Sequence, residues 1–389
     1  MKLLKVTDRK TEKLFLDAPR VIYAGDKTWV CPLDNDIKAI FDPEKNTYFK
    51  HGVVDRWVLT ADNGKLIGRI AAFIDFSLSG TYDQPTGGMG FFECINDRDA
   101  AFLLFDTARE WLKEKGMEAM DGPINFGETD KYWGLLVDGF THPSFDVPYN
   151  HPYYQALLEA YGFQTYYKME GFHLDITKPM PDRVFKIAEW VAAKPGYKFR
   201  HFTWKEEDEL VADFAEVFNE AWASFKTNFE PLEPAYIKQF LKKGKPILEE
   251  EFIWIAYFED KPIAIYLMFP DLNQILKHLN GKLNLPGLVK FLWFRQRKAM
   301  TRAKGVLMGV IPKYQNLGIE SAFIYKLVDV FRSKPHYTEI EFSWVADFNP
   351  KMRKIFISVG SVPAKQYITY RYLFDRNKEF KRYPIPDIK

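Results

Sequence analysis

The stretch from Val306 to Arg332 constrains the fold of this 389-residue chain more than any other part of it. Its first part, Val306 to Ile311, is apolar and β-prone, and Pro312 and Gly318 delimit a short polar turn. From Ile319 onward, apolar residues recur at the spacing of one helical face. The pattern predicts a strand, a tight turn and a helix. Because the first N–H groups of a helix have no partner within it, this turn favours an anion such as a phosphate.

Composition is typical of a globular protein. The chain is 47% hydrophobic and 27% charged, and its length is enough for two or three domains. A formal net charge of +2 predicts no general attraction to DNA or to membranes. Two cysteines, and seven histidines without ligand spacing, predict neither a disulfide framework nor a metal site. No signal peptide and no apolar run of ~20 residues is present, so a cytoplasmic protein without a transmembrane segment is expected.

The two halves of the chain repeat one order of elements. Each half reads as a hairpin, a helix, a strand, a helix closed by glycine and a last strand. Residues 177–182 (T-K-P-M-P-D) break regular structure between them. We therefore predict an α+β (mixed α/β) fold of two domains, residues 1–178 and 179–389. Each domain is expected to be a mixed, mostly antiparallel sheet flanked by helices.

The individual elements follow from periodicity and from turn residues. Asn63-Gly64 is a strong hairpin signal, and Gly116, Gly162 and Gly360 close helices. Helices are expected at 99–115, 151–161, 185–193, 208–222, 234–242, 319–332 and 350–359, and strands at 57–60, 65–74, 88–94, 118–122, 165–176, 197–202, 252–258, 262–269, 306–311, 338–344 and 367–374.

Two motifs resemble signatures of the GNAT-type N-acyltransferases. Val310-x-Pro312-x-x-Gln315-x-x-Gly318 resembles the loop that holds the pyrophosphate of acyl-CoA. Asn349, followed by Gly360 eleven residues later, resembles the second signature, in which an Asn opens a helix. The resemblance is clear over the C-terminal half and weaker over the N-terminal half. It implies two tandem GNAT-like domains in which the strands before these helices splay apart.

The resemblance also implies a donor and its site. Acetyl-CoA or another acyl-CoA is the expected co-substrate, with its pantetheine arm in the gap between the splayed strands. The residues expected to bind it are Met308, Val310, Gln315, Asn316, Leu317, Gly318, Ile319, Glu320 and Asn349.

The C-terminal half departs from the family pattern at two positions. Glu320 stands where the loop has Gly or Ala, and it either opposes the phosphates or faces outward and complements the helix dipole. Phe356 stands where many family members have a Tyr that protonates the leaving thiolate. Tyr367 or Tyr370, which follow closely, is the expected substitute for that acid.

The N-terminal half lacks the phosphate loop, because an acidic segment precedes its equivalent helix. We therefore expect it to contribute the substrate side of the site, through the Gly-rich segment 122–134. The residues expected to bind substrate are Asn125, Asp130, Tyr132 and Trp133. A general base must be a carboxylate near the thioester, and the candidates are Glu128, Asp130 and Asp271.

Residues 275–304 form a basic insertion between the expected strands 262–269 and 306–311. They contain eight Lys or Arg, one His and no acidic residue, around the apolar run L-P-G-L-V-K-F-L-W-F. A basic amphipathic helix of this kind contacts a membrane surface, an anionic donor or tRNA. The alternative is a flap packed on the domain by Leu288, Phe291, Leu292 and Trp293, with its basic face in water.

Three hypotheses about function follow. The first is N-acyl transfer from acyl-CoA to the amine of a small molecule or a peptide. The second is a Fem-type transferase, which pairs two such domains and uses aminoacyl-tRNA. The third, motivated by Glu320 and Phe356, is a GNAT-like protein that binds a metabolite without turnover.

Overall fold

The computed structural model describes residues 1–129, 131–179, 181–223 and 231–384. The N-terminal half contains β1 (Lys2–Lys5), α1 (Arg9–Ile22), α2 (Asp34–Ile40), β2 (Gly52–Thr60), β3 (Leu66–Asp75), β4 (Thr86–Cys94), α3 (Arg98–Glu114), β5 (Ala119–Gly122), β6 (Leu135–Asp138), α4 (Tyr154–Tyr161) and β7 (Gln164–Asp175). The C-terminal half contains α5 (Asp182–Ala192), β8 (Tyr197–His201), α6 (Glu207–Trp222), α7 (Pro234–Gly244), β9 (Ile253–Phe258), β10 (Lys261–Pro270), α8 (Asn273–Leu276), α9 (Leu285–Gln296), β11 (Arg302–Val310), α10 (Ile319–Ser333), β12 (Glu339–Ala346), α11 (Pro350–Ser358) and β13 (Val362–Leu373).

Within the described ranges, one mixed sheet runs through both halves. Its strand order is β1-β2-β3-β4-β5-β13-β7-β12-β11-β10-β9-β8, and β6 pairs with β13 off this path. The pairs β4–β5 and β11–β12 are parallel, and the other pairs are antiparallel. The predicted fold class, a mixed and mostly antiparallel sheet flanked by helices, is confirmed.

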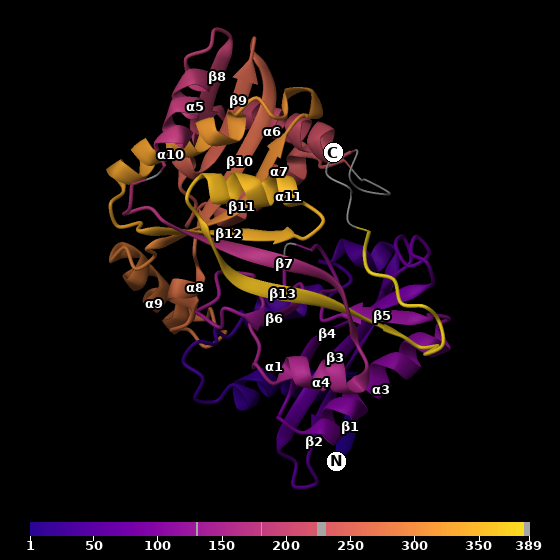
Figure 1. Cartoon of the computed structure of the whole chain (residues 1–389). Helices are drawn as coiled ribbons and strands as arrows, with labels where there is room; N and C mark the ends of the chain where they lie inside the picture. The colour runs from indigo at the N-terminus through magenta and orange to yellow at the C-terminus, as the bar shows by residue number, and fades with distance from the viewer. Residues whose placement is uncertain (130, 180, 224–230, 385–389) are drawn as a thin grey trace.

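The two halves exchange their last strands. In an unexchanged repeat β5 would pair with β7 and β12 with β13. Instead β5 pairs with β13, and β12 pairs with β7. Figure 1 shows β7 and β13 crossing the middle of the molecule together, and they pair with each other along most of their length. The boundary between residues 178 and 179 stays a prediction about the sequence repeat, because the sheet itself is continuous.

Local sequence explains the ends of the elements that flank the sheet. Asn63-Gly64 turns β2 into β3, with Gly64 at φ 81°. Helix α3 begins at a side-chain cap, where Asp97 accepts a hydrogen bond from Ala100 N. Helix α4 ends at Gly162, whose φ of 109° closes the helix in a left-handed conformation. The Asn-Gly turn and the closing glycine are signals from which the sequence predicted these ends, whereas the Asp97 cap was not predicted.

Helices cover both faces of the sheet. Buried residues of α3 and α4 pack on the sheet of the N-terminal half around Leu104, Phe105 and Tyr154. In the C-terminal half α10 and α11 pack on one face through Phe323 and Phe356, while α6 and α7 pack in a separate cluster. The carboxyl end of β11 meets both clusters, since Val310 packs in the cluster of α10 and Ile311 in the cluster of α6 and α7.

The basic insertion forms α8 and α9 and packs against the N-terminal half. Ile275, Leu276 and Phe291 share a core with Val30. Arg20 Nη2 donates to the Asn280 carbonyl at 3.1 Å, which ties the insertion to α1. The predicted packing of this flap is wrong in part, since Phe291 is buried but Leu288, Leu292 and Trp293 are 43–48% exposed. Over the residues that the structure describes, no helix combines the length and the apolarity that crossing a membrane requires.

Candidate functional site

The strands β11 and β12 separate after four paired residues. Their parallel pairing runs from Arg302–Glu339 to Gly305–Phe342. Beyond that point β11 continues beside β10 to Val310, whereas β12 continues beside β7 with a register shift. The gap that the GNAT resemblance implies between these strands is therefore present.

Backbone groups of β11 point into this gap. Ile311 N donates to the Ile263 carbonyl at 2.9 Å, so the amide of residue 311 faces β10. Because amides alternate in direction along a strand, the N–H groups of Val310 and Met308 face the side that β12 has left. An extended chain with amide groups, such as a pantetheine arm, would find donors and acceptors there.

The loop after β11 holds its shape through its own polar groups. Gln315 Nε2 donates to the Val310 carbonyl at 3.1 Å, which closes the turn. Asn316 at φ 64° and Gly318 at φ 83° adopt left-handed conformations, and Leu317 is 38% exposed. Helix α10 begins at Ile319 without a side-chain cap. The residue before the helix, Gly318, has no side chain that could cap these N–H groups, although the Glu320 carboxylate interacts with its own backbone N–H in the first turn.

Glu320 is half-buried in the first turn of α10. Burial raises its pKa, while its own backbone N–H and Lys351 act in the opposite direction. The carboxylate therefore lies against the helix start rather than pointing freely into water. Helix α5 covers the same turn, because a Cβ on Gly318 would come within 3.0 Å of Ile187 Cγ2.

The second GNAT-like motif has the expected structural role. Asn349 caps α11, with its Oδ1 accepting a hydrogen bond from Met352 N at 3.3 Å. Phe356 is buried and stacks on Phe342, with ring centroids 4.4 Å apart and an angle of 20° between the planes. The Phe356 side chain therefore packs in the hydrophobic core and does not line the gap between β11 and β12.

The two tyrosines expected to act as the acid do not lie in the gap. Both are on β13, which the strand exchange separates from β11 by β7 and β12. Tyr367 is 1% exposed, and its hydroxyl has no hydrogen-bond partner among the described residues. Tyr370 donates to Glu159 Oε1 at 2.9 Å inside the N-terminal half. Burial raises the pKa of both phenols, and their placement does not favour the expected role.

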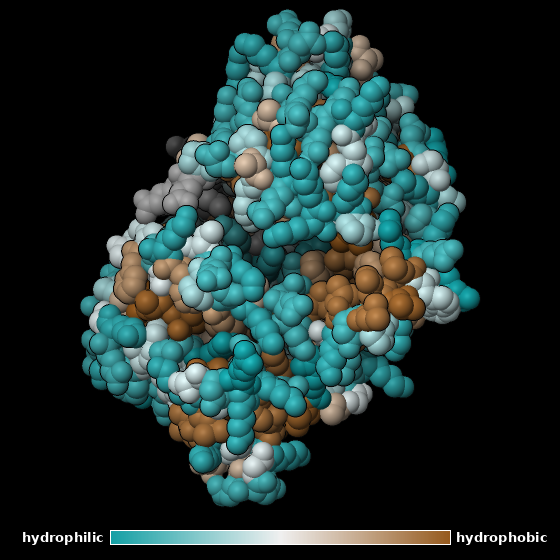
Figure 2. Space-filling model, turned by 180° about the vertical axis from the view of Figure 1, so that it is seen from behind, coloured by the Kyte–Doolittle hydropathy of each residue, from teal (hydrophilic) through white to brown (hydrophobic). Residues whose placement is uncertain are grey.

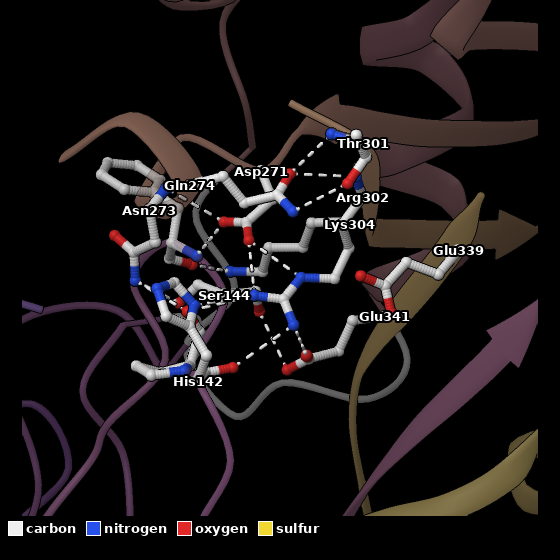
Figure 3. Close-up of polar contacts among 12 residues, drawn as sticks. His142, Ser144, Asp271, Asn273, Gln274, Thr301, Arg302, Lys304, Glu339 and Glu341 are labelled. Atoms are coloured by element: carbon white, nitrogen blue, oxygen red, sulfur yellow. Dashed lines mark hydrogen bonds and ion pairs between the residues drawn. The ribbon is translucent and has the colours of Figure 1, made fainter. Parts of the chain in front are cut away.

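Asp271 is buried in an ionic network at the junction of the two halves (Figure 3). Its Oδ2 accepts from Arg302 Nη2 at 2.7 Å and from Nε at 2.9 Å, and its Oδ1 accepts from Phe145 N at 2.8 Å. Burial raises the pKa of Asp271 although Arg302 lowers it. With both oxygens occupied and no exposed surface, Asp271 is placed as a structural partner of Arg302 rather than as a general base.

The network extends to residues that the sequence did not single out. Arg302 also pairs with Glu341 at 3.1 Å, and Glu341 pairs with Lys365 at 2.8 Å. Burial alone would raise the pKa of Glu341, but Lys365 and Arg302 together lower it below its ordinary value. His142 Nδ1 lies 3.2 Å from Arg302 Nη2, and burial with this cation lowers the His142 pKa to about 4. His142 is therefore neutral at pH 7 and accepts a hydrogen bond from Arg302 (Figure 3).

The equivalent gap in the N-terminal half is filled by the chain itself. The strands β4 and β5 pair only from Thr86 to Gly88 on the β4 side. Ile124 N then donates to the Met89 carbonyl at 2.9 Å, and a Cβ on Gly90 would lie 1.8 Å from the Ile124 carbonyl oxygen. Together with the Asp97 cap on α3, this leaves no comparable gap beside β4.

The residues expected to bind substrate do not line one common cavity or surface. Asn125 is 3% exposed and its Oδ1 lacks a partner among the described residues. Trp133 Nε1 donates to the Tyr167 hydroxyl at 2.6 Å. Glu128 is exposed, and Asp130 lies outside the described residues. Of this group, only Tyr132 lines the cavity described next.

A partly open cavity of about 100 Å³ lies beside α8, largely in the N-terminal half. Its wall includes the ion pair of buried Arg69 with half-buried Glu93, whose Nη2 and Oε1 lie 3.6 Å apart. Tyr154 also lines it and donates to Glu93 Oε2 at 3.1 Å. Arg69 Nε has no partner in the described part of the chain. None of the residues 308–320 lines this cavity. The sequence analysis did not predict this cavity. The available signal was Arg69, a charged residue inside the otherwise apolar strand β3.

No group of three or more His, Cys, Asp or Glu side chains that could hold an ion occurs in the ranges covered by the structure. Both cysteines are buried, and burial raises the pKa of Cys31 to about 11.

Comparisons with known proteins agree with the architecture. No model of a protein family matches the sequence. The chain is 26% identical over 363 residues to a protein of Caulobacter vibrioides called bacterial ceramide synthase, covering 92% of this chain and 94% of that one. It is also 26% identical over 364 residues to the protein YghO of Escherichia coli, covering 92% of each.

A solved structure provides the fold comparison. A tandem GNAT protein from the clavulanic acid biosynthesis pathway superposes with a TM-score of 0.55 at 13% identity, covering 96% of this chain and 98% of that one. At 13% identity, the similarity between the two structures supports a shared fold and nothing further. The chain therefore has the tandem GNAT fold.

Proposed function

We propose that this protein is an N-acyltransferase that moves an acyl group from acyl-CoA to the amine of a long-chain lipid. The observation that carries the donor half of this proposal is the gap between β11 and β12 with the uncapped start of α10 at its end. The acceptor half is supported by the relative called bacterial ceramide synthase, since a ceramide is an amide of a fatty acid and a long-chain amine.

The donor would be held by groups that suit its parts. The N–H groups at the start of α10 suit the pyrophosphate, because unpaired amides and the helix dipole both favour an anion. The backbone of Met308 to Val310 suits the amide-rich pantetheine arm. The thioester would then lie where β11 and β12 separate, beyond Gly305.

The reaction itself needs few protein groups. The neutral amine attacks the thioester carbonyl, the carbon–sulfur bond breaks, and an amide and a CoA thiolate form. The attacking nitrogen loses one proton and the thiolate gains one, so the overall reaction neither consumes nor releases a proton. Holding both reactants in line supplies much of the acceleration of such a step.

The test is turnover with defined substrates. The full-length protein is incubated with a long-chain acyl-CoA and sphinganine, free thiol is measured, and the amide is detected by mass spectrometry. We expect equal amounts of thiol and amide, and less product with acetyl-CoA or with a short water-soluble amine. Thiol release without an amide, or no release with any pair of donor and amine, would overturn the proposal.

A further inference from the structure

The outer face of α9 is apolar and turned to solvent. Leu285, Leu288, Val289, Leu292 and Trp293 are 77, 43, 62, 48 and 47% exposed. Their spacing, i, i+3, i+4, i+7 and i+8, places all five on one helical face. On the opposite face, Gly287 and Phe291 are buried against the insertion core. A helix of a soluble domain normally directs such a stripe inward.

This stripe is flanked by cations. Lys282, Lys290, Arg295, Arg297 and Lys298 are exposed, and none takes part in the ion pairs found among the described residues. Arg297 lies over the Trp293 ring at 4.0 Å, so one cation extends directly from the apolar stripe. No acidic residue occurs between 275 and 304.

The stripe is visible as part of the molecular surface. Helix α9 lies at the left of Figure 1, and the 180° turn brings that side of the molecule to the right of Figure 2. Hydrophobic residues, drawn in brown, gather there. Helix α8, on the inner side of the same insertion, contributes Asn273 and Leu276 to the wall of the Arg69–Glu93 cavity. The segment that carries the exposed apolar helix α9 thus also lines this cavity through α8.

We propose that α9 docks this protein on the surface of an anionic lipid bilayer, with its apolar stripe in the acyl-chain boundary and its cations at the headgroups. Charge complementarity identifies the partner: a bare cationic rim around an apolar centre matches anionic headgroups above hydrocarbon. Tryptophan at the edge of the stripe suits the interface. This goes beyond the proposed activity and does not depend on it.

Two other occupants fit the surface less well. Single-stranded or folded RNA would use the cations but would leave four aliphatic side chains exposed to water. A second copy of the chain would cover the aliphatic side chains but would bring two cationic rims together. A bilayer with anionic headgroups satisfies both features of the face.

The experiment measures partition of the full-length protein onto vesicles by flotation. Vesicles of phosphatidylcholine alone are compared with vesicles that also contain phosphatidylglycerol, at low and high salt. An apolar variant carries Val289→Asp and Leu292→Asp, and a charge variant carries Lys290→Glu and Arg295→Glu. Matched controls are Trp190→Asp, which changes a 61% exposed apolar residue on α5, and the pair Lys242→Glu and Lys243→Glu on α7.

We expect the wild type to bind vesicles that contain phosphatidylglycerol and to lose binding at high salt. Each α9 variant should partition about tenfold less, and each control should partition like the wild type. Circular dichroism checks that the variants stay folded. Absence of wild-type binding, or unchanged binding of either α9 variant, would overturn the proposal.

Two further outcomes would also overturn it. If light scattering shows that the wild type is a dimer and the apolar variant a monomer, while vesicle binding is unchanged, the face joins two copies of the chain. If the charge variant loses binding to tRNA, while the apolar variant keeps it and neither changes vesicle binding, the face belongs to RNA. Because no assay here requires acyl-CoA, a failure of the proposed activity leaves this result interpretable.

Discussion

Glu320 is the residue that we expect to have the strongest effect on binding of the proposed donor. It occupies the first turn of α10, next to the N–H groups that suit a pyrophosphate, and burial raises its pKa. An ionised carboxylate there repels a diphosphate, whereas a protonated one does not. The donor affinity of the protein should therefore depend on the protonation of this one side chain.

We predict that Glu320→Gln binds acyl-CoA about tenfold more tightly at pH 7.5, from the Coulomb energy of one charge near two phosphates in a watery site. The wild-type affinity should rise as the pH falls through the raised pKa of Glu320, because protonation removes the same charge. In the variant this rise should be much smaller. Calorimetric titration measures both, with Asp329→Asn, an exposed change on α10, as control. Equal affinities at every pH would contradict the prediction.

Asp121 and Arg371 join β5 of one half to β13 of the other. Arg371 Nε donates to Oδ1 at 2.6 Å and Nη2 donates to Oδ2 at 2.7 Å, and both residues are buried. The ring of Tyr166 lies 3.5 Å from the guanidinium carbon. Removing one partner leaves the other as an uncompensated buried charge.

Asp121→Ala is accordingly expected to lower the free energy of unfolding by about 3–5 kcal/mol. Urea titration followed by circular dichroism measures it. Asp62→Ala serves as control, because Asp62 is exposed and pairs only with the N-terminal amine. A loss no greater than that of the control would show that the pair contributes little to joining the halves.

At the scale of elements, sequence and structure agree where a local signal exists. The hairpin turn at Asn63-Gly64, the caps at Asp97 and Asn349 and the closing Gly162 each fix an end of an element. The apolar pattern of Val306 to Arg332 predicted the strand, turn and helix that became β11 and α10 for the same reason.

The placement of the tyrosines could not be predicted in this way. Tyr367 and Tyr370 are on a strand whose neighbours are chosen by tertiary pairing, and no local signal in β13 indicates β5 rather than β12 as its partner. The outward apolar face of α9 is a similar case, because helical spacing shows a stripe but not the direction in which it points.

The separation of β11 and β12 leads to a prediction about amide exchange. The amides of Met308 and Val310 face the gap and lack a strand partner there, so they should exchange quickly in the free protein. Adding CoA should slow exchange in a peptide that covers these residues. A peptide from β10, which is paired on both sides, is the control. Unchanged exchange in the β11 peptide at saturating CoA would place the ligand elsewhere.

At the scale of the whole molecule, the exchange of β7 and β13 makes the halves depend on each other. Cutting the chain after residue 178 would leave β5 without β13 and would expose both edges of β7. Unpaired edges with buried side chains are unstable and prone to aggregate.

We therefore expect residues 1–178 alone to lack a cooperative unfolding transition, and residues 179–389 alone to behave likewise. The two pieces produced together should associate and recover a cooperative transition. Thermal unfolding followed by circular dichroism, with size-exclusion chromatography, measures this. A cooperative transition in an isolated half would show that its own strands suffice.

The proposed donor site also depends on the whole molecule, since the two halves repeat one plan but, among the described residues, only the C-terminal half keeps the gap. The loop after β11 and the uncapped α10 suit acyl-CoA, whereas in the N-terminal half Asp97 caps α3 and the segment at Ile124 fills the gap. We therefore propose a single acyl-CoA site, in the C-terminal half.

Calorimetric titration with a long-chain acyl-CoA tests this claim most directly. We predict one molecule bound per chain, and binding at least tenfold weaker in Gly318→Val, where a side chain would meet Ile187 in a left-handed backbone. Gly116→Val, at φ 80° with open space around it, should bind like the wild type. No binding, two molecules per chain, or equal affinity in both glycine variants would contradict the account.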